Sequence, residues 1–306
     1  MTATTPTGVP VPYHVGANGL AYGPAVNLAI AEGCSSAGAD PFRPYPGYSD
    51  IADLQLAASS NYNALQFLLR RSVGGLELNL AYTYSHSIDD SSDRYDASFT
   101  NTYAPAANRA SSNFDQRQML NVGYVWDIPV FRHAGLAHNL LGGWQISGIT
   151  TFSTGSPFSV IDDTDNGGVG NGVGSAAYAD IIGDPRTTAH PVDEYGRLFY
   201  NPAAYATPTA LTFGDSGRNS LNNPDFINFN MAVFKHFTIK ESTAIEFRCE
   251  AFNVFNHTEW LPIAGQGGSG ANLNGTYTNT LGTPNFLYSG GVHENRVLQF
   301  ALKFLF

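Results

Sequence analysis

The segment Gly214-Asp215-Ser216-Gly217 places a serine in the type of glycine-rich context that surrounds a protease nucleophile. A nucleophilic serine needs a histidine base within hydrogen-bond reach and an acid that orients this base. Arg218-Asn219 follow where a further glycine is expected, and no histidine of the chain lies in a recognisable partner context. We therefore predict a loop turn at Ser216, no catalytic residue, and a chain that is not an enzyme.

Two acidic segments offer oxygen ligands of the kind that Ca²⁺ prefers. Residues 162–168 read Asp-Asp-Thr-Asp-Asn-Gly-Gly, and the second segment carries Asp89, Asp90, Asp93 and Asp96. Carboxylates two residues apart before glycines can wrap Ca²⁺, but residues 162–168 lack the closing glutamate of the complete loop. We favour solvated loops at both places over a Ca²⁺ site, and we expect no cofactor.

The composition excludes several classes of protein. The formal net charge is −10, so the chain has no basic stripe that could neutralise the phosphates of a nucleic acid. Hydrophobic residues make up 43% of the chain, which argues against long disorder. No apolar run approaches the ~18 residues of a membrane helix. The 2 cysteines, Cys34 and Cys249, and the 8 scattered histidines suggest neither a disulfide scaffold nor a zinc site. A glycine- and aromatic-rich β protein remains.

The strongest pattern is an alternation of apolar and polar residues that begins at Tyr62. A period of two is the signature of a strand with two unlike faces. In residues 76–88, for example, Leu80 and its apolar neighbours fall on one face, while Glu77 falls on the other. Seven such segments are predicted, at residues 62–71, 76–88, 117–128, 140–152, 226–239, 244–256 and 296–306.

The connections between these segments alternate in length. Short or moderate ones lie at residues 72–75, 129–139 and 240–243, and long ones at 89–116, 153–225 and 257–295. An outer-membrane barrel has this arrangement, with short periplasmic turns and long external loops. We therefore predict two regions, residues 1–61 as mostly external loop and residues 62–306 as barrel strands.

Three features favour a transmembrane antiparallel barrel over a soluble sandwich. The segments reach the ~9–11 residues that a tilted strand needs to cross a bilayer. The only charges on the apolar faces are Arg71, Lys235 and Arg296, each near a segment end, where the cost falls to ~0–1 kcal/mol. Aromatic residues gather near the same ends, as interfacial girdles do.

This interpretation assigns the two faces of the strands. The residues predicted to face lipid are Leu78, Leu80, Tyr82, Phe247, Phe300, Leu302 and Phe304. The residues predicted to face the lumen are Gln66, Arg70, Glu77, Asn79, Thr83, Glu246, Arg248, Glu250, Gln299 and Lys303. The lumen-facing set either lines a ligand path or contacts a plug, or it only hydrates the barrel wall, and we favour the last of these.

Several short motifs resemble Oar-like TonB-dependent receptors over about residues 40–306. They are the strand–turn–strand unit of residues 61–90, Asp115-Gln116-Arg117, Gly142-Gly143-Trp144-Gln145-Ile146-Ser147-Gly148, Gly217-Arg218-Asn219 and Phe252-Asn253-Val254-Phe255-Asn256-His257. The closing residues 299–306 resemble the terminal strand that barrel assembly machinery reads, with Phe306 as the assembly signal.

The resemblance implies a barrel of about 22 strands with an N-terminal plug. Such receptors import a scarce iron chelate, cobalamin, oligosaccharide or peptide with energy relayed by TonB. This sequence shows no signal peptide, TonB-contacting segment or plug, and about seven strands. We therefore expect the C-terminal portion of a receptor in the cell outer membrane. Its expected partners are outer-membrane lipid, upstream barrel strands and the plug, the TonB system through that plug, the assembly machinery and an unknown ligand. The alternative is a secreted soluble β domain that acts as an adhesin or carbohydrate-binding module.

Overall fold

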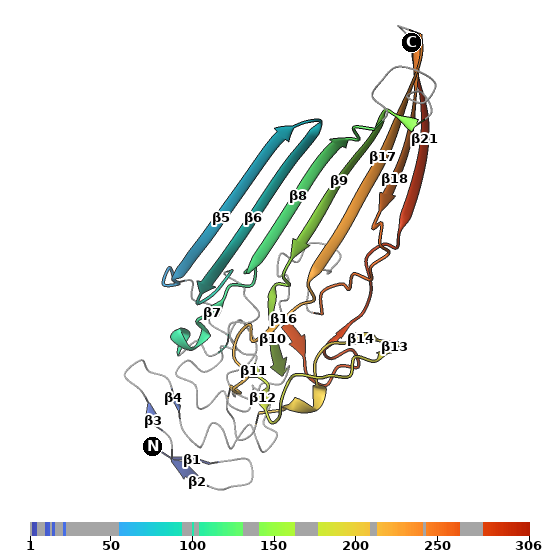
Figure 1. Cartoon of the computed structure of the whole chain (residues 1–306). Coiled ribbons are helices and arrows are strands. Elements are labelled where there is room, and N and C mark those ends of the chain that lie inside the picture. The colour runs from blue at the N-terminus through green and yellow to red at the C-terminus, as the bar shows by residue number, and fades with distance from the viewer. Residues whose placement is uncertain are drawn as a thin grey trace.

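Seven long strands form one antiparallel sheet in the computed structural model of the chain (Figure 1). The structure describes residues 55–93, 100, 104–130, 141–162, 177–208, 213–240, 243–263 and 278–306, and four short strands before residue 23. In sheet order the long strands are β21 (Val297–Leu305), β18 (Thr243–Phe252), β17 (Phe226–Lys240), β9 (Trp144–Ser153), β8 (Gln118–Asp127), β6 (Leu76–Asp89) and β5 (Ser60–Val73). The prediction of an all-β fold with seven long strands is confirmed.

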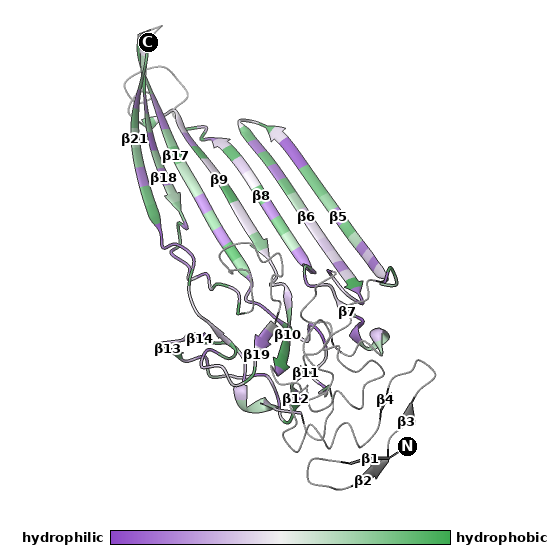
Figure 2. Ribbon diagram, turned by 180° about the vertical axis from the view of Figure 1, so that it is seen from behind, coloured by the Kyte–Doolittle hydropathy of each residue, from purple (hydrophilic) through white to green (hydrophobic). Residues whose placement is uncertain are grey.

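The register of the sheet brings the alternating apolar residues of neighbouring strands onto one face. Leu69 pairs with Leu80, and Leu80 pairs with Val122. Across the other half, Cys249 pairs with both Val233 and Phe300. Residues that pair directly across neighbouring strands point to the same side of a sheet. The apolar face is therefore continuous from β5 to β21, and the polar face lies behind it. Figure 2 colours the apolar and polar residues of these strands.

The turn between β5 and β6 is as short as an antiparallel pair allows. It consists of Gly74 and Gly75, with φ angles of 64° and 85°. Two successive positive φ angles characterise the hairpin turns that match the twist of the flanking strands, and glycine adopts them without strain. The two glycines therefore fix the register of the longest hairpin, from Val73↔Leu76 to Ser60↔Asp89.

The sixth strand is shorter than its alternating pattern predicts. Residues 244–256 alternate, but β18 ends at Phe252. Asn253 has a φ of 49° and its side chain closes a turn, since Asn253 Nδ2 donates to the His257 carbonyl at 2.9 Å and Asn253 Oδ1 accepts from the His257 amide at 2.9 Å. The prediction of strand as far as residue 256 is wrong because asparagine supplies its own local hydrogen bonds.

The long connections were predicted to be loops, and this is wrong for part of them. β10 (Pro157–Asp162) pairs with β11 (Ala177–Tyr178), with β16 (Leu221–Asn222) and, in parallel, with β19 (Thr278–Thr280). Two smaller sheets join β12 (Asp180–Ile181) to β15 (Tyr205–Ala206), and β13 (Val192–Asp193) through β14 (Gly196–Leu198) to β20 (Tyr288–Ser289). We use the name loop domain for the described residues within 157–222, which contain β10 to β16, together with residues 253–263 and 278–296, which contain β19 and β20.

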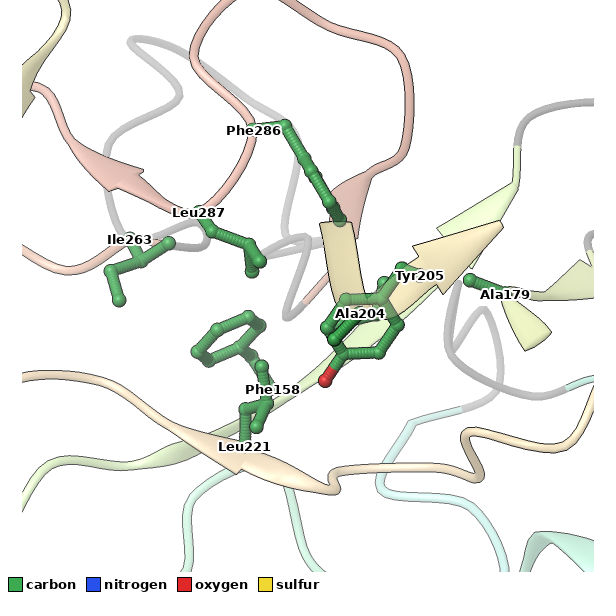
Figure 3. Close-up of a cluster of buried hydrophobic side chains, with 9 residues drawn as sticks. Phe158, Ala179, Ala204, Tyr205, Leu221, Ile263, Phe286 and Leu287 are labelled. Atoms are coloured by element: carbon green, nitrogen blue, oxygen red, sulfur yellow. The ribbon is translucent and has the colours of Figure 1, made fainter. Parts of the chain in front are cut away.

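The loop domain holds the hydrophobic core. Phe158, Leu221, Ile263 and Leu287 converge in one cluster together with Ala179, Ala204, Tyr205 and Phe286 (Figure 3). Every buried hydrophobic residue of the described part of the chain belongs to this domain. On the long sheet, by contrast, Leu65, Phe300 and Phe304 are exposed by 67%, 65% and 60%. In a soluble sandwich the apolar sheet face is the buried one, so the structure has the opposite arrangement.

The described residues contain no helix that could cross a membrane. Their described 3₁₀ helices are single turns at Pro105–Asn108 and Pro202–Ala204. The first 54 residues lie almost entirely outside the described part of the chain, apart from the short strands β1 (Thr2–Thr4), β2 (Pro10–Pro12), β3 (His14–Val15) and β4 (Ala21–Tyr22). The boundary predicted at residue 61 therefore stays a prediction.

Candidate functional site

A row of charged side chains runs along β18 on the polar face of the sheet. Arg248 lies between two carboxylates, with Nη2 3.5 Å from Glu246 Oε1 and Nη1 3.5 Å from Glu250 Oε1. His236 Nδ1 lies 3.7 Å from Glu246 Oε2. These contacts are long and partly exposed, so each contributes only about 0–1 kcal/mol. Such a row is suited to a water-filled space, because the same charges would be costly in a dry interior.

All ten residues predicted to face the lumen lie on this polar face. Lys303 is paired with Glu246 and Gln299 with Glu250, while at the far side of the sheet Gln66 is paired with Thr83 and Arg70 with Asn79. The seven residues predicted to face lipid all lie on the apolar face, as the pairs of Tyr82 with Phe67 and Phe247 with Leu302 illustrate. The sequence thus separated the two sets correctly into two faces, and which face meets lipid stays a prediction.

The polar face is hollowed. A concavity of about 960 Å³ extends across β5, β6, β8, β9, β17 and β18. Its walls include Arg70, Glu77, Asn79 and Glu250. A few residues of the apolar face, such as Met231, also line the concavity. Each of them stands in the chain between two lining residues of the polar face, as Met231 does between Asn230 and Ala232. The sheet therefore curves with its polar side inward.

Lys235 is one of the three charges on the apolar face that the sequence places near segment ends, and the structure shows how it is accommodated. Its Nζ donates to the carbonyl of Gly142. The ammonium also lies 5.0 Å from the ring centroid of Phe237 and 5.7 Å from that of Trp144. These rings and the carbonyl bury Lys235 at the short-turn end of β17, where cation–π contacts replace part of its hydration.

A buried arginine fastens the loop domain to the sheet. Arg218 Nη1 donates to Asp89 Oδ1 at 2.7 Å, and the side chains of this pair are 0% and 3% exposed. Arg218 Nη2 donates to Ser92 Oγ at 2.8 Å and to Asn113 Oδ1 at 3.1 Å. Asp89 is the last residue of β6, so the guanidinium connects the strand end, the connection after it and the loop domain.

Asn219 extends this anchor. Its Nδ2 donates to Asn113 Oδ1 at 2.8 Å and to the Ser111 carbonyl at 2.6 Å, while its amide donates to Ser159 Oγ at 2.9 Å. A φ of 53° lets Asn219 turn toward both segments. The motif Gly217-Arg218-Asn219 was identified from sequence through a resemblance alone, and the structure gives it a physical role.

A second motif closes the connection between β6 and β8. Asp115 Oδ1 accepts from the Ser87 amide at 2.7 Å. Asp115 Oδ2 lies 2.9 Å from His86 Nδ1 and 3.1 Å from Arg117 Nε. The buried carboxylate thus ties the start of β8 back to the end of β6.

Ser216 is engaged by the main chain. It is buried, its Oγ donates to the Val160 carbonyl at 3.2 Å, and its amide donates to the Ala179 carbonyl at 3.0 Å. Asp215 Oδ1 accepts from the Ile181 amide at 2.7 Å. The predicted loop turn is present and fastens β10 to β12; the absence of enzyme activity stays a prediction.

The acidic segment after β6 has arginine partners. Asp89 pairs with Arg218, and Asp90 Oδ1 lies 3.1 Å from Arg109 Nη1. Hydrogen bonds from Ser59, together with Arg109, hold the pKa of Asp90 below its usual value. Residues 163–168, Asp96 and Cys34 lie outside the described residues, whereas Cys249 is a free thiol on the apolar face. No group of metal-ligating side chains occurs in the described ranges.

The comparison with protein families decides the architecture. A model of the family described as "Outer membrane beta barrel domain" matches residues 13–299. The chain belongs to this family. The long sheet is therefore part of an outer-membrane barrel, and its strands are transmembrane strands. No curated protein and no solved structure matches the chain.

Membership of this family places the protein in the outer membrane. The alternative of a secreted soluble β domain required its apolar face to be buried, whereas Phe300 and Leu302 on the barrel strands are exposed by 65% and 59%. The barrel is open, because no strand of the described residues joins β5 to β21.

Proposed function

We propose that this chain is the C-terminal wall and external domain of an Oar-like TonB-dependent receptor, which imports a scarce ligand through a larger barrel. The observation that carries the proposal is the open seven-stranded sheet, which is concave on its polar side and has the loop domain at the end where the long connections lie. The motifs of the sequence support the receptor type.

The directions of the edge strands argue for strands from a longer barrel rather than from a second copy. Six antiparallel steps separate β5 from β21, so the two edges run in the same direction. Two copies with the same orientation in a membrane would meet edge to edge as parallel strands. Outer-membrane barrels of single chains pair antiparallel throughout and have even strand numbers. An odd number of additional strands satisfies both conditions.

The hollow supports the assignment of the polar face to the lumen. The inside of a barrel wall is its concave side, and the concave side here carries Arg70, Glu77, Asn79 and Glu250. The apolar face, with Leu65 and Phe300 exposed, then meets lipid. A sheet edge cannot remain unpaired in hydrocarbon, so this assignment also requires partner strands at β5 and β21.

The loop domain supports a role in ligand capture. It lies at the end of the sheet to which all long connections lead, opposite the Gly74–Gly75 turn (Figure 1). In an outer-membrane barrel this end is external. A domain with its own core holds side chains in fixed positions, as a selective binding surface requires.

Energised uptake is tested in the native bacterium. Uptake of three radiolabelled probe classes, namely iron chelates, cobalamin and oligosaccharides or peptides, is compared between the wild type, a deletion of this coding region and a tonB deletion. We expect uptake of one probe class to be lost equally in both deletion strains and in wild-type cells whose proton gradient is collapsed. Uptake of every class at the wild-type rate, or a loss that ignores the gradient, refutes the receptor.

The facing of the strands is tested separately by cysteine labelling in a Cys34→Ser/Cys249→Ala background. We expect Leu80→Cys to react with a lipid-soluble maleimide and Asn79→Cys with a small water-soluble one. The opposite result reverses the assignment of the two faces.

A further inference from the structure

The loop domain contains an arginine that is held by aromatic rings rather than by a carboxylate. Arg197 lies on β14, the central strand of the sheet β13–β14–β20. Its Cζ is 5.2 Å from the ring centroid of Phe199 and 5.8 Å from that of Trp260. The two rings themselves meet edge to face at 6.2 Å. The guanidinium is therefore positioned by stacking.

No hydrogen bond or ion pair to the Arg197 side chain occurs within the described residues, and its buried Nε has no partner there. Two other arginines of the loop domain differ: Arg218 is paired with Asp89, and Arg186 with Asp184. A guanidinium presents five donors in a planar fork. Only the buried Nε carries the cost of an unpaired donor. Arg197 is half-buried, so the other donors of the fork can bind an acceptor from outside the domain.

The surroundings of Arg197 are apolar and accessible. Val192 is the direct cross-strand partner of Arg197, shares its face of the sheet, and is 64% exposed. Trp260 is bridged to Val292, which is 44% exposed, and the next residue, Leu261, is 38% exposed. One cation on a patch of aromatic and aliphatic surface matches a ligand with one planar oxyanion and an apolar body.

The charge of the chain narrows the ligand further. With a formal net charge of −10, the protein repels polyanions, and Asp193 and Glu194 follow Val192 directly. Carboxylate and phosphate both fit the guanidinium fork through two parallel hydrogen bonds, and the singly charged carboxylate is the one that this acidic chain repels less.

We propose that Arg197, stacked on Phe199 and Trp260, is the anion-binding subsite of an external capture surface for monocarboxylates with an apolar or aromatic body. The inference rests on the proposed uptake function for its biological purpose, whereas the binding event itself does not depend on energised transport.

Binding is measured with named probes on outer-membrane vesicles that carry the full chain in its native membrane. The probes are indole-3-acetate and benzoate, with their neutral amides as matched controls, detected by saturation-transfer NMR. We expect the acids to bind at least about 10-fold more tightly than the amides, which is the size expected for hydrogen bonds to a charged group. Equal binding of acid and amide, or no binding of either acid, overturns the subsite.

Two sets of variants test the residue. Arg197→Gln should weaken acid binding by about 10-fold or more and leave amide binding unchanged, while Arg186→Gln, an exposed arginine of the same domain, should change neither. If Arg197→Gln fails to fold, the exposed neighbour Val192 keeps the test valid. Val192→Asp should weaken and Val192→Lys should strengthen acid binding, because both retain Arg197 and change only the charge beside it. Acid binding that is unaffected by all of these changes overturns the proposal.

The two proposals fail separately. Acid-selective binding without TonB-dependent uptake retains the subsite and refutes the receptor. TonB-dependent uptake together with equal binding of acid and amide retains the receptor and refutes the subsite.

Discussion

Replacing Arg218 by methionine should release the loop domain from the barrel. The guanidinium donates to five acceptors, Asp89 Oδ1, the Asp89 and Asn108 carbonyls, Ser92 Oγ and Asn113 Oδ1, at 2.7 to 3.3 Å. Its side chain is 0% exposed and that of Asp89 only 3%. Removing one member of a buried pair leaves the other as an uncompensated charge, which costs about 3–5 kcal/mol.

This loss of stability can be measured as an increase in the rate at which a protease cleaves the loop domain. When opening is fast, cleavage follows the population of the open form. A loss of about 3–5 kcal/mol corresponds to a population of open loop domain that is about 100- to 4,000-fold larger, since 1.4 kcal/mol is a factor of ten. Intact cells are treated with an external protease, and cleavage of the loop domain is followed over time. The barrel is monitored in the same samples by its heat-dependent gel mobility.

Arg186→Met is the matched control. Arg186 also pairs with an aspartate of the loop domain, Asp184, but the two side chains are 88% and 57% exposed. An exposed pair is worth about 0–1 kcal/mol, so cleavage should change little. The double variant Asp89→Asn/Arg218→Met should be more resistant than Arg218→Met, because it leaves no buried charge. If Arg218→Met and Arg186→Met are cleaved at the same rate, our view of Arg218 as the anchor is incorrect.

Three further predictions concern the barrel wall, a buried phenol and a turn. Phe300→Arg, in the middle of β21 on the apolar face, should cost about 2–4 kcal/mol and lower the amount of heat-modifiable barrel, whereas Gln299→Arg should not; equal yields would contradict the assigned faces. Burial raises the pKa of Tyr205 to about 12, so the neutral phenol stabilises the loop domain below about pH 10, and this stability is lost as pH rises through about 12. Tyr205→Phe should remove the loss of protease resistance at alkaline pH. If the pH profile of this variant equals that of the wild type, the buried phenol is not the cause of that loss. Asn253→Ala should destabilise the turn after β18 by about 1–3 kcal/mol, because alanine is strained at a φ of 49° and the hydrogen bonds to His257 are lost. Asn253→Gly loses the same hydrogen bonds without the strain, so its effect should be smaller. Proteolytic cleavage next to the turn measures both effects.

The long strands could be predicted from sequence because their two faces meet different surroundings. A strand that is apolar on one side and polar on the other must alternate with a period of two, and Leu76 to Tyr84 do so without exception on the apolar side. The register then follows from matching apolar faces, since a slip of one residue would invert a whole strand. The same logic separated Glu77 and Arg248 from Leu80 and Phe247.

The loop domain could not be predicted in this way. Its strands are mostly two or three residues long, which is too short for a period to be visible. Its pairings join distant segments, as in the parallel pairing of Ser159 with Thr278. Arg197 carries no local signal either, because its aromatic partner Trp260 lies on another connection and only the fold brings the two together.

The composition of the core in the loop domain has a consequence for biogenesis. Phe158 comes from the connection before β17, whereas Phe286 and Leu287 come from the connection directly before β21. The core therefore cannot be completed until Phe286 and Leu287 have been synthesised and exported. Contacts so distant in sequence form slowly, so the loop domain should finish folding late. Any nascent chain halted before Phe286 should carry an incomplete, protease-sensitive loop domain.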